Sequence, residues 1–476
     1  MPGYHRFIAL CVIVIAFVGF LRLPAVERLV EETPPAPIEA RPRLVVMVVF
    51  DQLRGDYLEK WQPLFIEGGF KRLQAEGASF TNCHYPYCYT LTAPGHTSLA
   101  TGTYPAKHGI VSNDWYDRAN ADTVTSVTPP PGMVRSGLGP YRRQVRTIGD
   151  VLLDVLAGRG RVASLSIKDR AAILMAALRA QICYWVEPKS GQFVTSPFYR
   201  DEPHSWVKAF NAGNPADQFL NRDWVRSRTD LDYEKYSGPD DFFAEGIGYG
   251  QGQVFPHPTT LGVGPKAKER YYQAMENSPF GNELLFDFAK TAIVAEKLGQ
   301  TDAVDLLCLS FSSNDLVGHC WGPNSQEVLD ITLRSDRMMK ELLDFLDAKV
   351  GKGNYVFAVS ADHGVCPLPE FAAKEGKNSG RAAPEILTSL AESHLNSVFL
   401  PKGGKESWFE TPNKYNPWIY LNRPLLRELK LDQSKVERAL ADWMSKQTGI
   451  FNAFTRTEIM SPEPAEPGSY LDMVRK

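Results

Sequence analysis

The hydrophobic and polar positions of the chain fall into two kinds of segment, amphipathic helices and short, continuous apolar runs. Residues 44–50 (LVVMVVF) form a β-branched run that ends at Asp51, and such a run is typical of a strand covered on both faces. An amphipathic helix, a glycine-containing turn and a buried strand then follow one another within residues 146–167, 290–311 and 338–362. This alternation predicts an α/β fold with a mostly parallel sheet and helices on both faces.

Two segments interrupt the pattern. Residues 31–43 (EETPPAPIEARPR) combine acidic residues with four prolines, which disfavours packing and predicts a linker. Residues from about 184 to 285 are rich in aromatic residues, glycine and proline, and we interpret them as a large inserted cap over the site. The chain is therefore divided into an N-terminal segment 1–25, a proline-rich linker 26–43 and one folded domain 44–476.

The N-terminal segment has the pattern of a targeting sequence. His5 and Arg6 precede an unbroken apolar stretch, residues 7–21, which is the layout of a secretory signal peptide. The stretch is shorter than the about 20 residues of a membrane span. No clear small-residue cleavage site follows it, so an uncleaved N-terminal anchor is the alternative. In both cases we expect export to the periplasm or the extracellular space.

Composition narrows the choice of partners. The chain is 43% hydrophobic and 22% charged, as expected of a globular protein, and its net charge of −3 gives no basic excess for binding nucleic acid. Six of its seven cysteines follow the leader and could pair in an oxidising compartment, but their spacing does not choose among the pairings. Cys308 lies within an apolar run and is expected to be buried.

Charged residues follow the predicted strands. Four predicted strands each lead into one of Asp51, Lys168, Asp315 and Asp362. Ligands of parallel α/β sheets gather beyond the carboxyl ends of the strands, so we expect these side chains to lie close together.

Two aspartate and histidine pairs are candidate metal ligands. Asp362 and His363 are adjacent, and Asp315 and His319 are four residues apart, which places them on one face of a helix. Either pair alone could equally be a turn or N-cap aspartate beside an unrelated histidine. Together with Asp51, the pairs favour a Zn²⁺ site, because zinc binds carboxylate and imidazole ligands.

Thr92 begins the segment TAPGHTSLATG, residues 92–102. A threonine hydroxyl is a poor nucleophile at neutral pH unless a metal or a base activates it, and a threonine before Ala-Pro often only forms a turn. The whole segment, however, matches the nucleophile segment of the alkaline phosphatase superfamily position for position. Sulfatases need Cys or Ser at the first position to make formylglycine, so sulfatase activity is disfavoured.

From about residue 44 to its end, the chain resembles the single-threonine, zinc-dependent alkaline phosphatases of the PafA type, which are relatives of the nucleotide pyrophosphatases/phosphodiesterases. The segments that carry the resemblance are VVFDQLRGDY, TAPGHTS, HGIVSNDWYD, SIKDRAAIL, SSNDLVGH and SADHGV. The resemblance implies an alkaline-phosphatase-like α/β fold, two zinc ions in a complete site, and hydrolysis of small phosphate monoesters through a phosphothreonine.

The resemblance also implies a role for each candidate residue. One zinc would be held by Asp51, Thr92, Asp362 and His363, and the other by Asp315 and His319.

Three further residues would bind the substrate. Asn113 matches the residue that hydrogen-bonds a phosphoryl oxygen, and Lys168 and Arg170 match the pair that distinguishes monoesterases from diesterases. Two fixed cations suit a monoester, which carries an extra anionic oxygen. The alternative for this pair is an exposed charged turn.

One feature departs from the family pattern. The family completes the Asp315 and His319 site with a histidine close to the C-terminus, and the only histidine after His363 is His394, on a predicted helix face. We therefore expect a full-length protein to continue beyond Lys476.

Two other interpretations of the activity stay open. A phosphodiesterase or nucleotide pyrophosphatase is favoured by the shared metal ligands and opposed by Lys168 and Arg170, and an inactive ligand-binding homologue would fit the absent histidine. His96 and His108, beside the nucleophile motif, are interpreted as structural.

Overall fold

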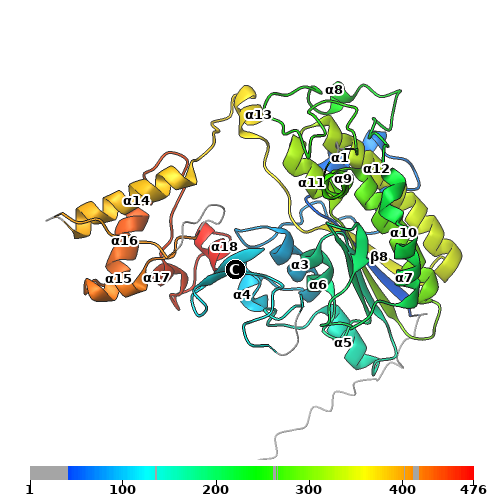
Figure 1. Ribbon diagram of the computed structural model, residues 1–476, viewed down its shortest axis with the longest axis horizontal. Helices are drawn as coiled ribbons and strands as arrows, with labels where there is room; N and C mark the ends of the chain where they lie inside the picture. The colour runs from blue at the N-terminus through cyan, green and yellow to red at the C-terminus, as the bar shows by residue number, and fades with distance from the viewer. Residues whose placement is uncertain (1–40, 134–136, 261–263, 265, 401–402, 411–417) are drawn as a thin grey trace, which may run out of the picture. The chain divides into compact units, whose positions relative to one another are not determined.

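The structure is a computed structural model that describes residues 41–133, 137–260, 264, 266–400, 403–410 and 418–476 (Figure 1). The predicted leader with Cys11, and the linker up to residue 40, lie outside the described residues. Residues 42–476 form one compact unit. In the described ranges, no helix combines the length and apolar character needed to cross a membrane.

A six-stranded sheet organises the described chain, in the order β6-β5-β4-β7-β1-β8. Its strands are β1 (Leu44–Phe50), β4 (Val162–Ser166), β5 (Ile182–Glu187), β6 (Gln192–Val194), β7 (Asp305–Phe311) and β8 (Tyr355–Ala361). All neighbouring strands pair in parallel except β5 with β6. A separate antiparallel pair joins β2 (Asp114–Asp117) to β3 (Asp122–Thr125). The predicted mostly parallel α/β fold is confirmed.

Helices cover both faces of the sheet (Figure 1). The helices that precede β7 in the chain are α1 (Tyr57–Lys60), α2 (Phe70–Glu76), α3 (Thr92–Thr101), α4 (Pro105–His108), α5 (Ile148–Val155), α6 (Asp169–Met175), α7 (Ser205–Ala212), α8 (Tyr233–Tyr236), α9 (Ala267–Glu276) and α10 (Pro279–Ala295). They are followed by α11 (Ser313–Trp321), α12 (Gln326–Leu346), α13 (Pro369–Lys374), α14 (Pro384–Phe399), α15 (Arg423–Glu428), α16 (Gln433–Met444), α17 (Arg456–Ile459) and α18 (Tyr470–Arg475).

Strand β1 shows why its sequence is apolar throughout. Val46, Val48 and Phe50 face a core completed by α10 and α12, whereas Val49 belongs to a second core completed by α3, α5 and α6. Successive side chains of a strand point to opposite faces, so a strand between two helical layers is buried on both faces and favours apolar residues along its whole length. The first polar residue, Asp51, therefore comes directly after the end of β1.

The other parts of the described chain have cores of their own or extend these two. The segment predicted as a cap, residues 184–285, is inserted only in its middle part, because it begins within β5, includes β6 of the sheet and ends within α10. The part between β6 and α10 contains α7, α8 and α9 and places Trp224, Tyr271 and Phe219 in the α10 and α12 core. Helices α14, α15 and α16 pack around a third apolar cluster. Cys308 is 1% exposed, as predicted. The six cysteines of the described residues are free thiols in this structure.

Candidate active site

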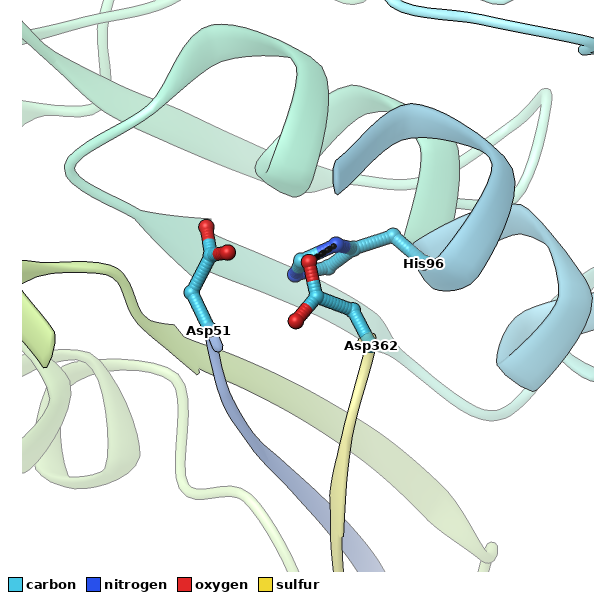
Figure 2. A group of neighbouring side chains, drawn as sticks. All are labelled: Asp51, His96 and Asp362. Carbon is cyan, nitrogen blue, oxygen red and sulfur yellow. Dashed lines mark ion pairs between the residues drawn. The ribbon is translucent and has the colours of Figure 1, made fainter. Parts of the chain in front are cut away.

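The carboxyl ends of four adjacent parallel strands carry the candidate residues. Phe50, the last residue of β1, pairs with Phe311 at the end of β7 and with Ala361 at the end of β8. Asp51 therefore follows β1 beside Asp362, which follows β8. Figure 2 shows both carboxylates reaching into the same space, together with His96 from a neighbouring helix. The register of the parallel strands thus brings together residues more than 300 positions apart. The backbone N–H of Gln52 donates a 3.0 Å hydrogen bond to Oδ1 of Asp362, which joins two such positions directly.

Thr92 is the first residue of α3 and is 3% exposed. The helix N-terminus carries unpaired backbone N–H groups and a partial positive charge, which favours an anionic group there. One of these groups, the N–H of Ala93, donates a 2.9 Å hydrogen bond to Oδ1 of Asn113. Because the amide oxygen of Asn113 is used in this way, its nitrogen Nδ2 is the end that can donate to a bound anion.

Helix α3 lies directly against the end of β8. A Cβ atom placed on Gly95 would come within 2.1 Å of the carbonyl oxygen of Asp362. Only a residue without a side chain allows this approach, which accounts for the glycine in TAPGH. The packing therefore places the first turn of α3, which begins at Thr92, against the backbone of Asp362.

Three buried carboxylates surround one imidazole. Asp51, Asp315 and Asp362 are 0%, 3% and 0% exposed. Nε2 of His363 lies 3.3 Å from Asp51 Oδ1, 3.5 Å from Asp362 Oδ2 and 3.8 Å from Asp315 Oδ1. On α11, Nε2 of His319 lies 3.1 Å from Asp315 Oδ1, as the four-residue spacing predicted, and the His319 side chain is 69% exposed.

The oxygens of this cluster fit a metal ion. Within the described residues, Asp51 Oδ1 and Asp362 Oδ2 are buried and accept no hydrogen bond. A buried carboxylate without a donor is costly unless a cation compensates it. Asp51, Asp315 and His363 offer ligand atoms within 4.8 Å of one another. Carboxylate oxygen and imidazole nitrogen are donors that Zn²⁺ accepts.

His96 forms a second geometrical group with Asp51 and Asp362, but its ring nitrogens are engaged. Nδ1 lies 2.8 Å from the carbonyl oxygen of Thr92, and Nε2 lies 2.7 Å from Oγ of Ser310. A nitrogen that faces a carbonyl oxygen carries a hydrogen and has no lone pair for a metal. His96 is therefore not a ligand in this arrangement.

The carboxylates set the proton affinities of the cluster. Burial lowers the pKa of His363, but Asp362 and Asp51 outweigh it and raise that pKa to about 10. For Asp51, burial acts upward, yet the charge of Lys168 and the contact with His363 bring its pKa well below the ordinary range. Burial and the Asp51 charge raise the pKa of Asp362. The cluster therefore attracts positive charge.

Lys168 bridges the two candidate metal sites. Its Nζ lies 2.9 Å from Asp51 Oδ2 and donates a short hydrogen bond to Asp315 Oδ2. Arg170, two residues further on, contacts Asp169 at 3.8 Å and has a buried Nε that, among the described residues, has no hydrogen-bond partner. Of the pair predicted to bind the phosphoryl group, Lys168 thus lies at the site, on the carboxylates of Asp51 and Asp315, whereas the ion pair of Arg170 is with its neighbour Asp169.

Gln52 is a site residue that the sequence did not reveal. Its Nε2 donates a 2.8 Å hydrogen bond to Asp315 Oδ1, and its backbone N–H donates to Asp362 Oδ1 at 3.0 Å. Its φ of 65° lies in the left-handed region, which is uncommon for glutamine and marks local strain at the site. Its position directly after Asp51, at a strand end, was the only signal in the sequence.

The chain is similar in sequence to known proteins. The family model for type I phosphodiesterase/nucleotide pyrophosphatase matches residues 45–382. The chain is 34% identical to alkaline phosphatase PhoV of Synechococcus elongatus, over 87% of this chain and 74% of the relative. It is 33% identical to alkaline phosphatase PafA of Elizabethkingia meningoseptica, over 90% and 78% of the two chains.

The fold agrees as well. The crystal structure of wild-type alkaline phosphatase PafA superposes with a TM-score of 0.80 at 32% identity, over 91% of this chain and 82% of that one. The chain belongs to the type I phosphodiesterase/nucleotide pyrophosphatase family. Its predicted resemblance to the PafA-type alkaline phosphatases is confirmed in sequence and in fold.

Proposed function

We propose that the chain is a zinc-dependent alkaline phosphatase that hydrolyses small phosphate monoesters with Thr92 as the nucleophile. The observation that carries this proposal is the burial of Thr92 at the N-terminus of α3, a helix that packs through Gly95 against Asp362. Among the described residues, Asp362 Oδ2 and Asp51 Oδ1 are buried there without a hydrogen-bond donor. Two relatives named as alkaline phosphatases support the reaction class.

The ligand assignment keeps the predicted sets. Asp51, Asp362 and His363 would hold one zinc together with Thr92, and Asp315 and His319 would contribute to the second. Bound zinc supplies Lewis-acid stabilisation of the negative charge that develops on the reacting oxygens. Gln52 holds Asp315 and Asp362 in place through its two hydrogen bonds, each to the Oδ1 atom of the carboxylate.

The remaining residues bind and orient the phosphoryl group. Thr92 loses its hydroxyl proton and attacks phosphorus in line, the bond from phosphorus to the ester oxygen breaks, and the leaving alkoxide takes up a proton and departs as the alcohol. Water then hydrolyses the phosphothreonine to threonine and inorganic phosphate. Asn113 donates from Nδ2, and the backbone N–H groups at the start of α3 favour the anion. Lys168 and Arg170 compensate the extra negative oxygen of a monoester.

Export and the cap are further parts of the proposal. The apolar N-terminal stretch supports a signal peptide or an N-terminal anchor and hence a periplasmic or extracellular location. The inserted segment contacts the helix that carries Asp315 and His319, because the N–H of Gly246 donates to the Cys320 carbonyl at 2.7 Å and the N–H of Gly248 to its Sγ at 2.9 Å. These contacts support a wall of the site built by the insertion.

Phosphodiester hydrolysis is the second candidate, because the matching family model is named for phosphodiesterases. The two activities share the metal ligands and differ in the charge that the site must compensate. Rates on an aryl phosphate and on the corresponding diaryl diester, measured on one preparation of known metal content, distinguish them. A rate on the diester that equals or exceeds the rate on the monoester would favour the second candidate.

The test of the nucleophile is a pair of threonine variants on one helix. Thr92→Ala should lose the acid-stable phosphoenzyme and at least about 1,000-fold in turnover, since it removes the reacting oxygen, while Thr92→Ser retains some activity. Thr101, whose Oγ1 donates to the Thr97 carbonyl at 2.7 Å within the same helix, provides the matched control Thr101→Ala. Parental turnover by Thr92→Ala would show that the proposed mechanism is wrong.

A further inference from the structure

His96 is buried between the nucleophile and a candidate metal ligand. The residue is 0% exposed and lies on α3, one turn after Thr92. Its Nδ1 lies 2.8 Å from the Thr92 carbonyl oxygen. The same nitrogen lies 3.2 Å from Asp362 Oδ2 (Figure 2). One ring nitrogen thus contacts both the residue proposed to attack phosphorus and a carboxylate proposed to bind zinc.

The contacts determine where the ring carries its hydrogen. Both neighbours of Nδ1 are oxygen acceptors, so Nδ1 carries a hydrogen in either charge state of the ring. The hydrogen bond is directed at the Thr92 carbonyl, and Asp362 Oδ2 lies beside it without accepting a hydrogen bond of its own. On the other side of the ring, Ser310 Oγ lies 2.7 Å from Nε2 and fixes the plane of the imidazole.

The Asp362 carboxylate has little freedom to rotate. Its Oδ1 accepts from the backbone N–H of Gln52 at 3.0 Å and from that of His363 at 2.9 Å. Its Oδ2 is thereby directed toward Asp51, His363 and the edge of the His96 ring. Loss of the ring would leave this oxygen without its polar neighbour on the α3 side.

A chain of serine hydroxyls extends the contact to the Lys168 turn. Ser310 Oγ lies 3.4 Å from Ser312 Oγ, which lies 3.2 Å from Ser166 Oγ. Ser166 Oγ in turn accepts a 3.1 Å hydrogen bond from the backbone N–H of Lys168. The three serines are each 0% exposed; Ser166 ends β4, Ser310 lies near the end of β7, and Ser312 directly follows β7. Buried polar networks of this kind fix one geometry, because each group depends on its partner.

We propose that His96, with Ser310, Ser312 and Ser166, is a positioning network that holds the Thr92 turn, the Asp362 carboxylate and the Lys168 turn in one arrangement. This inference rests on the proposed function, because it concerns the residues assigned to zinc and to the phosphoryl group. His96 itself touches neither substrate nor metal. Its effect passes through Asp362 and Thr92, as expected of an outer hydrogen-bonding partner of a metal ligand.

The experiment compares two buried histidines of the same segment. His108 is also 0% exposed, accepts from the Ile110 N–H at 3.2 Å through Nδ1 and bonds Ser98 Oγ at 3.0 Å through Nε2, but it contacts none of the candidate ligands. His96→Leu and His108→Leu therefore remove the same group from the same part of the fold. His96→Asn keeps a donor close to the position of Nδ1.

The readouts are zinc affinity by competition with a chelator, the spectrum of the cobalt-substituted protein, the melting temperature and kcat/KM for an aryl phosphate. His96→Leu should weaken zinc binding by about 10- to 100-fold, the range for lost partners of metal ligands, and change the cobalt spectrum. His96→Asn should recover most of the affinity. His108→Leu should lower the melting temperature and leave zinc affinity unchanged.

Three results would overturn the inference. Equal losses of zinc affinity in His96→Leu and His108→Leu would mean that both act through general stability. Parental zinc affinity in a folded His96→Leu protein would show that the network does not position the ligand. A loss far above 100-fold without recovery in His96→Asn would make His96 a direct ligand. Failure of the proposed function is distinguishable from these results, because the parental protein itself would then bind no zinc.

Discussion

Replacing Gly95 by alanine tests the packing that connects the nucleophile to the metal ligands. On propensity alone, alanine in a helix is about 1 kcal/mol more favourable than glycine, so Gly95→Ala would stabilise α3 in open space. The structure reverses this expectation, since the new Cβ would lie 2.1 Å from the carbonyl oxygen, 2.7 Å from the carbonyl carbon and 2.8 Å from the Cβ of Asp362.

The size of the effect follows from these contacts. Real Cβ atoms essentially never approach closer than 3.0 Å, so α3 and the end of β8 must separate by about 0.9 Å. Overpacking costs about 1–3 kcal/mol, and a contact with backbone places this case at the upper end. After the gain in helix propensity, about 2 kcal/mol of destabilisation remains, which corresponds to about 2 °C in the melting temperature of a unit of this size. A misplacement of about 1 Å costs about 100-fold in rate.

The assay therefore separates catalysis from stability. Gly95→Ala should lose about 100-fold in kcat/KM for an aryl phosphate while the melting temperature changes by only a few degrees, measured at saturating zinc. Gly55, where an added Cβ meets nothing within 4 Å, provides the control Gly55→Ala, which should match the parent in both measurements. A Gly95→Ala protein that melts higher than the parent and keeps its activity would refute the reasoning.

Four further outcomes are expected. Burial lowers the pKa of His108 to about 4, so below about pH 6.5 the unfolded state binds more protons than the folded state. Urea unfolding should therefore show a free energy of unfolding that is about 2 kcal/mol lower at pH 5 than at pH 7 because of this residue. The same loss between the two pH values in His108→Gln would contradict the assignment to His108. The buried Asp336 accepts hydrogen bonds of 2.7 Å from the backbone N–H groups of Ile66 and Phe70, at the start of α2. Asp336→Ala should therefore lower the free energy of unfolding by about 2–3 kcal/mol, while kcat/KM stays within about twofold of the parent. Lys168→Met or Arg170→Met should cost about 3 kcal/mol of transition-state stabilisation toward a monoester and much less toward a diester; equal losses would assign the pair a structural role. Chelation should abolish turnover and lower the melting temperature, both restored by zinc, and activity that survives complete metal removal would exclude the proposed site.

The fold class and the positions of the reactive residues along the chain could be predicted from the amino-acid sequence. A run such as residues 44–50, apolar at every position, is typical of a strand between two layers, and the repeated order of helix and strand leaves a parallel sheet as the simplest arrangement. Strand ends then follow from where the apolar runs stop, so Asp51, Asp315 and Asp362 could be placed at one edge before any contact was known. The spacing of Asp315 and His319 was also sufficient, because a helical turn is a local property.

The contacts among these residues depend on the folded arrangement of the sheet and its helical layers. The contacts of Gln52 with Asp315 and Asp362 join three strand ends, and they depend on a register that no local pattern encodes. The same holds for Lys168, whose ammonium lies between Asp51 and Asp315, and for His96, which the sequence assigned only a structural role. Hydrogen bonds between distant residues require atoms to agree within a few tenths of an ångström, and that agreement arises only when the sheet and both helical layers have packed.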